Sequence, residues 1–104
     1  MKVAISSNGD NLDSEMDSRF GRCKFFAIYD SEDQSTTFID NTAASLTEGA
    51  GPAALQLLTA QGVSKLVSGN FGIKIKSLSS DLNVQLIVMR ENHTIRSIIN
   101  ILNH

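Results

Sequence analysis

A lone cysteine lies within a short basic segment of the sequence. Cys23 is accompanied by Arg19, Arg22 and Lys24, so three cations fall within six residues. Positive charge beside a thiol favours the thiolate, which is the form that binds metals, and it also attracts anionic ligands. The plainer alternative is a small cysteine that packs at the start of a strand while the cations are solvated. The segment is therefore a candidate site for an anion or a metal, with an inert cysteine as the alternative.

Two glycine-containing turns could bring backbone N–H groups close to a ligand. One runs from Ser68 to Gly72, and the other is Glu48-Gly49-Ala50-Gly51-Pro52. Glycine permits close backbone approach, and a helix that begins at such a turn favours an anion at its N-terminus. Ordinary strand-to-helix turns have the same composition. The second turn lacks the GxGxxG spacing and the chain has no GxxxxGK[ST] motif, so nucleotide binding has no strong support.

The other candidate ligands are scattered along the chain. His93 could bind a metal or an anion, although a solvated loop histidine is the simpler interpretation. Asp10, Asp13, Glu15 and Asp17 form an acidic cluster that lacks the glycine and glutamate spacing of an EF-hand, so a solvated acidic loop is predicted. The sequence also has no HExxH, CxxC or nucleophile-elbow motif, so it gives little support for a catalytic function.

The hydrophobic pattern predicts the elements that position these residues. Five strands are expected, at Lys2–Ile5, Phe25–Asp30, Ser35–Asp40, Val63–Ser68 and Val84–Met89. Helices are expected at Pro52–Gln61 and after Thr94, a predicted N-cap followed by Ile95, Ile98, Ile99 and Leu102 on one face. Phe71–Leu78 fits a strand or a helix, and a helix is favoured if the last two strands are parallel, because parallel strands need a crossover. Asn8–Arg22 has no clean period and is predicted to be a long surface loop.

This order of elements predicts an α/β fold. The first half of the chain contains an antiparallel hairpin, and the second half alternates helices with strands, which gives a mixed sheet with helices on its faces. Ligands of such sheets gather beyond the carboxyl ends of the parallel strands. Ser6–Gly9, Ser68–Gly72 and Arg90–His93 are expected at that edge.

Composition limits the classes of function. The 104 residues are 41% hydrophobic and 19% charged, which is typical of one globular domain over residues 1–104. A net charge of −2 argues against general attraction to nucleic acid or to an anionic membrane. One cysteine cannot form an internal disulfide or a four-thiolate cluster site. No signal peptide or membrane-spanning stretch is evident, so a reducing cytoplasm is the expected location.

Four segments, in this order and spacing, resemble motifs of the dinitrogenase iron–molybdenum cofactor-binding family. They are the opening strand Met1–Ser6, the FGR…F segment Phe20–Phe26, the GAGP turn Gly49–Pro52 and the GN.G turn Gly69–Gly72. The resemblance runs nearly from end to end of the chain. It implies a ribonuclease H-like, three-layer α/β/α fold with a five-stranded mixed sheet whose second strand is antiparallel. It also implies that Phe71–Leu78 is a helix.

The resemblance further implies a non-catalytic carrier of a preformed iron–sulfur or molybdenum–iron–sulfur cluster, related to nitrogenase cofactor biosynthesis. Such a cluster is anionic and has its own sulfides, so one thiolate, one imidazole, cations and backbone N–H groups could hold it. Cys23 and His93 are the expected metal ligands, and cluster-assembly or acceptor proteins are the expected partners. The cofactor-binding residues expected from the matching motifs are Arg19, Gly21, Arg22, Cys23, Lys24, Gly49, Gly51, Gly69, Asn70 and Gly72.

One departure from the family keeps other hypotheses open. Many members have histidine before GAGP, whereas this chain has Glu48, whose carboxylate would repel an anionic cluster. Glu48 and the acidic loop favour a protein-interaction or regulatory domain that keeps the fold without a cluster. A nuclease of the ribonuclease H type is disfavoured, because the first strand contains no acid and Asp30 and Asp40 lie at hairpin ends.

Overall fold

A computed structural model describes residues 1–90 and 92–103, and its elements follow the predicted order. Glu91, within the predicted edge segment Arg90–His93, lies outside the described residues, as does His104. The strands are β1 Lys2–Ser7, β2 Phe25–Asp30, β3 Ser35–Asp40, β4 Val63–Ser68 and β5 Gln85–Val88. The helices are the short 3-10 helix η1 Thr42–Ser45 and the α-helices α1 Ala50–Ala60, α2 Ile73–Asp81 and α3 Ile95–Leu102. None of the helices in the described ranges is long and apolar enough to cross a bilayer.

Small differences from the prediction occur at the helix starts. The helix α1 begins two residues before the predicted Pro52, because Gly49 adopts the left-handed conformation (φ 72°) and serves as the N-cap. Pro52 still lies in the first turn, where its missing N–H group costs no helical hydrogen bond. The ambiguous segment Phe71–Leu78 is mainly helix, since α2 begins at Ile73. The predicted N-cap of α3 is confirmed, with Thr94 Oγ1 accepting from the N–H of Ser97.

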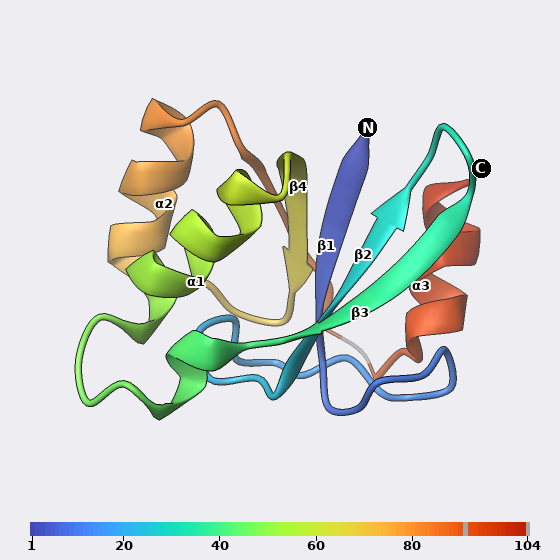
Figure 1. Cartoon of the computed structure of the whole chain (residues 1–104), viewed down its shortest axis with the longest axis horizontal. Helices are drawn as coiled ribbons and strands as arrows, with labels where there is room; N and C mark the ends of the chain where they lie inside the picture. Colours follow the sequence, from blue (N-terminus) through green and yellow to red (C-terminus); the bar gives the residue numbers. More distant parts are fainter. Residues whose placement is uncertain (91, 104) are drawn as a thin grey trace.

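The five strands form one mixed sheet with the order β3-β2-β1-β4-β5. The strand β2 runs antiparallel to both β1 and β3, whereas β4 runs parallel to β1 and to β5. The predicted mixed sheet with an antiparallel second strand is therefore confirmed. The helices α1 and α2 cover one face of the sheet and α3 covers the other (Figure 1). Both α1 and α2 begin at the edge where β1 and β4 end (Figure 1).

Side-chain alternation along the strands divides the apolar residues into two cores. Ala4 and Leu66 point toward α1, where they pack in one cluster with Leu55. Their strand neighbours Val3, Ile5 and Val67 point to the opposite face and pack in a second cluster with Ile95 and Ile98 of α3. A strand buried on both faces is expected in the centre of a sheet covered by helices.

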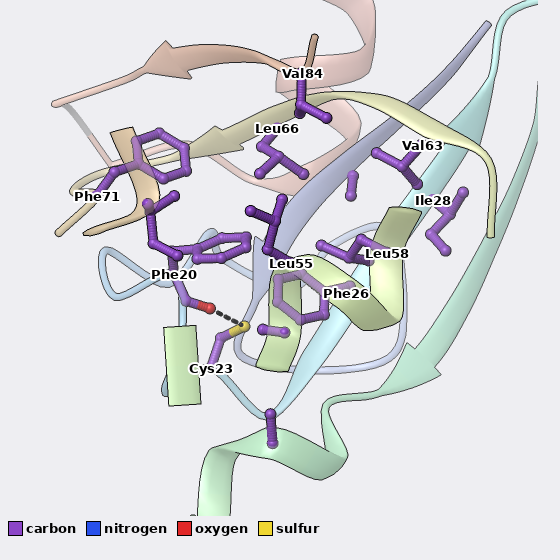
Figure 2. Close-up of a cluster of buried hydrophobic side chains, with 14 residues drawn as sticks. Phe20, Cys23, Phe26, Ile28, Leu55, Leu58, Val63, Leu66, Phe71 and Val84 are labelled. Atoms are coloured by element: carbon purple, nitrogen blue, oxygen red, sulfur yellow. Dashed lines mark hydrogen bonds between the residues drawn. The ribbon is translucent and has the colours of Figure 1, made fainter. Parts of the chain in front are cut away.

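Cys23 belongs to the core beneath α1. Its side chain is fully buried, and Sγ donates to the carbonyl oxygen of Phe20 at 3.3 Å, close to Phe26 (Figure 2). Burial raises the pKa of this thiol from 9.0 to about 12. The prediction that nearby cations favour the thiolate is therefore wrong. Arg22 and Lys24 are exposed, so their charges lie in solvent while the sulfur lies in the core.

We expect Cys23 to be unreactive in the folded protein. A chromogenic disulfide reagent at about pH 8 should label the native chain at least about 100-fold more slowly than the denatured chain, because the thiolate is scarce and inaccessible. The raised pKa also means that the folded state holds its proton more tightly. This contribution to stability is fully present below about pH 9 and is lost as the pH rises toward 12. Rapid stoichiometric labelling under native conditions would contradict the buried position.

Candidate functional site

A cleft of about 470 Å³ opens where α1 and α2 begin. Its walls come from three segments that are far apart in the sequence. The first is the loop 19–22, the second is the turn into α1 at 49–52, and the third is the turn into α2, with Asn70 and residues 72–75. The cleft therefore combines the basic loop with both glycine turns, which are the candidate sites that the sequence indicates.

Most of the predicted cofactor-binding residues lie in this cleft. The seven that line it are Arg19, Gly21, Arg22, Gly49, Gly51, Asn70 and Gly72. The predicted residues Cys23, Lys24 and Gly69 do not line it. Cys23 lies in the core, Lys24 is exposed just before β2, and Gly69 packs against Ser18.

The predicted metal ligands do not line the cleft. His93 is half-buried in another segment, where its carbonyl oxygen accepts the N–H of Met16 at 2.9 Å. Across residues 1–90 and 92–103, no group of three or more His, Cys, Asp or Glu side chains is placed to hold a metal ion. The described residues of the cleft thus supply charge and backbone groups, and no cage of metal ligands.

Two helix N-termini open into the cleft. Gly49 caps α1 and Gly72 caps α2, and within the described chain neither helix has a side-chain cap or an acidic residue in its first turn. In the same described region, the N–H groups of Ala50 and Gly51 in α1, and of Ile73 and Lys74 in α2, have no protein acceptor. Free N–H groups and the two helix dipoles make the cleft electropositive and suited to an anion.

Three cations line the cleft, and their partners differ. Arg19 is paired with Asp17: its Nε donates to Oδ1 at 3.3 Å and its Nη2 donates to Oδ2 at 3.2 Å. This contact raises the pKa of the guanidinium. Arg22 donates to backbone carbonyls of residues 44–47. Lys74 has no ion pair within the described residues. Lys74 is therefore the cation most available to an incoming anion.

Asp17 is not the solvated acid that the sequence predicts. Its side chain is only 6% exposed, whereas Asp10, Asp13 and Glu15 are exposed as expected. The carbonyl oxygen of Asp17 accepts the hydroxyl of Ser6 at 2.6 Å, and its carboxylate holds the N–H and the side chain of Arg19. Asp17 thus ties the loop to β1 and orients Arg19, a role that its place in an acidic run gave no means to predict.

Asn41 is a structural residue of the site that is not among the candidate residues of the sequence motifs. Its buried side chain donates from Nδ2 to the carbonyl oxygens of Gly21 at 3.1 Å and of Cys23 at 2.9 Å. Its Oδ1 accepts the N–H of Ala43 at 3.1 Å and so caps η1. An asparagine between a strand and a segment of small residues is a typical N-cap, and that was the available signal.

Glycines let the loop approach the two turns at backbone distance. A Cβ atom on Gly21 would lie 2.8 Å from the nitrogen of Gly51, and one on Gly69 would lie 2.9 Å from Cα of Ser18. Arg19 and Asn70 also form an isolated parallel bridge. Gly69 therefore serves the site through packing, although it does not line the cleft.

We expect Gly21→Ala to lower the free energy of unfolding by about 1–3 kcal/mol, because the added methyl group overlaps backbone that cannot rotate away. Gly72→Ala is the matched control. A Cβ there meets nothing within 4 Å, and φ is −68°, so the replacement of a glycine N-cap by alanine is the main cost and a smaller loss, below about 1 kcal/mol, is expected. Urea denaturation of both variants measures the difference. Equal losses would show that the contact between Gly21 and Gly51 does not constrain the loop.

Comparison with known proteins agrees with this architecture. Among solved structures, the apo form of the orange protein from Desulfovibrio gigas has 27% sequence identity and a TM-score of 0.91, over 98% of this chain and 86% of that one. A Thermotoga protein of the DUF35 family, provisionally described as a NifB protein, has 30% identity and a TM-score of 0.84, with the same two coverages of 98% and 86%. A search of curated proteins gave no match.

The family itself is identified by the sequence. The family model described as dinitrogenase iron–molybdenum cofactor matches residues 1–103, which is almost the whole chain. The predicted α/β fold is also shared with the structural neighbours. This chain therefore belongs to the dinitrogenase iron–molybdenum cofactor family.

Proposed function

We propose that this protein is a non-catalytic carrier of a preformed, anionic metal–sulfur cluster of the iron–sulfur or molybdenum–iron–sulfur kind. The cluster binds in the cleft between the starts of α1 and α2. One observation carries the proposal: in a chain of this family, two helix N-termini that have no side-chain cap among the described residues meet at one cleft. Cluster-assembly and acceptor proteins are its proposed partners.

The residues of the cleft determine how such a cargo is held. Among the described lining residues there is no cysteine, histidine or carboxylate, so the cleft offers no side chain that readily replaces a sulfide on a metal. The cargo must therefore arrive with its coordination positions filled. Lys74, Arg19 and the free N–H groups provide charge and hydrogen bonds, and apolar side chains such as Phe20 and Ile75 contact the large, weakly hydrated sulfides.

The alternative of an interaction domain without a cluster rested on Glu48 and the acidic loop. Glu48 is exposed and does not line the cleft, so its carboxylate acts on a bound anion only through solvent. Within the acidic loop, the negative charge of Asp17 is offset by its ion pair with Arg19. Neither feature blocks an anion from the cleft, and the carrier role is the stronger of the two proposals.

We expect the protein to bind tetrathiomolybdate, the simplest molybdenum–sulfur anion, with a shift of its charge-transfer absorbance in the absence of oxygen. Lys74→Met should weaken binding about 5- to 20-fold, since a charge-assisted contact contributes about 1–2 kcal/mol. Lys76→Met, on the same helix but outside the cleft, is the matched control. Cys23→Ala should leave the affinity within about twofold, because the thiol is buried in the core.

Two results of this titration would count against the proposal. Equal losses for Lys74→Met and Lys76→Met would place the anion outside the cleft. Loss of binding in a folded Cys23→Ala variant would instead favour the cysteine as a ligand.

Glu48→Gln should strengthen tetrathiomolybdate binding about two- to fivefold at low salt, because removal of an exposed like charge near the cleft is worth about 0.5–1 kcal/mol. The gain should shrink at high salt, where exposed charges are screened. Glu32→Gln is the control, since Glu32 is also exposed but lies in the turn between β2 and β3. The same gain in both variants would indicate an effect of net charge alone.

A further inference from the structure

Arg22 and Asn41 join two segments of the site by reciprocal hydrogen bonds. The guanidinium of Arg22 donates to the carbonyl oxygens of Ala44 at 2.9 Å, of Leu46, and of Thr47 at 3.4 Å. In the opposite direction, Asn41 donates to the carbonyl oxygens on either side of Arg22, those of Gly21 and Cys23. We refer to these contacts as the 22–41 clasp.

The clasp holds a segment that has little other support. The helix η1 ends at Ser45, and residues 46–49 are exposed and belong to no helix or strand. Leu46 donates its N–H to the carbonyl of Ala43 at 3.1 Å, but within the described chain the N–H groups of residues 47–49 make no backbone hydrogen bond. For the carbonyl oxygens of Leu46 and Thr47, the hydrogen bonds that the structure describes come from Arg22.

This segment leads directly into the wall of the cleft. Gly49 lines the cleft and caps α1, and the free N–H groups of Ala50 and Gly51 follow it. The direction in which these groups point therefore depends on where residues 46–49 lie. Of the five N–H donors that an arginine has, three are already used within the clasp.

We propose that Arg22 is a positioning residue, which shapes the α1 side of the cleft and does not itself bind the anion. The planar guanidinium reaches several carbonyl oxygens at once, a geometry that the single ammonium of lysine cannot reproduce. The effect on anion affinity rests on the proposed function. The clasp itself can be measured in the protein without any ligand.

The decisive variant is Arg22→Lys, which keeps the charge and removes the fork of donors. Amide hydrogen exchange should become at least about 10-fold faster at Ala44, Leu46 and Ala53, whose N–H groups donate to the carbonyl oxygens of Asn41, Ala43 and Gly49. These hydrogen bonds break when the segment opens locally, while exchange of the sheet is unchanged. Tetrathiomolybdate affinity should fall about 5- to 20-fold. The slope of log affinity against log salt should stay the same, because the number of charges has not changed.

Lys74→Met is the matched control, since it removes a charge from the cleft and leaves the clasp intact. It should lower both the affinity and the salt slope, with no change in exchange at Ala44, Leu46 and Ala53. Wild-type affinity in Arg22→Lys, together with weak binding in Arg22→Met, would overturn the proposal and make Arg22 a ligand cation. If the wild type binds no tetrathiomolybdate, the proposed function fails, and unchanged exchange in Arg22→Lys would then overturn the clasp separately.

Discussion

The neighbouring parallel strands β1 and β4 each carry a serine at or next to their last residue. The hydroxyl groups of both donate to one carbonyl oxygen, that of Asp17, with Ser6 at 2.6 Å and Ser68 at 3.3 Å. All three residues are buried, and the two hydroxyl oxygens also lie 2.8 Å apart, so one hydroxyl could still donate to the other without the loop. A displaced loop would therefore leave one buried hydroxyl without an acceptor, at a cost of about 1–3 kcal/mol. From this fixed point the loop passes Gly69 and then Gly51 at backbone distance. The turns into α1 and α2 therefore have a fixed position relative to each other, because both pack against this loop.

The electrostatics of the cleft depend on this arrangement more than on the number of arginines. The charge of Arg19 is offset by Asp17, and the donors of Arg22 are largely used by carbonyl oxygens. Each helix N-terminus carries about half a positive charge, so α1 and α2 together contribute about as much as Lys74. The cleft is therefore positive although the net charge of the chain is −2. The exposed carboxylate of Asp13 does not line the cleft and is paired with Arg96 of α3.

The strands and the gathering of the glycine turns could be predicted from the sequence. Aromatic and β-branched runs bounded by turn residues define β2, β3 and β4 to the residue, and turns that follow parallel strands must meet at one edge. The state of Cys23 could not be predicted, because proximity along the chain does not tell which side chains point into the core. The hydrogen bond of Asp17 to Ser6, and those of Asn41 to Gly21 and Cys23, join distant segments, and local pattern carries no information about these. The local pattern indicates only that Asn41 caps η1.

The buried cysteine fits the chemistry of a carrier. An accessible thiolate beside a metal–sulfur cluster can replace a sulfide and alter the cargo, because thiolate is a good ligand for the same soft metals. Burial keeps the thiol of Cys23 protonated, with its pKa at about 12, and directs it to the carbonyl of Phe20. A cleft that offers only charge, N–H groups and apolar contact is suited to the reversible binding of an intact anion, as the proposed function requires. Under the proposed carrier function, none of these contacts would be a metal–ligand bond, so the cargo would pass to an acceptor without ligand exchange on this chain.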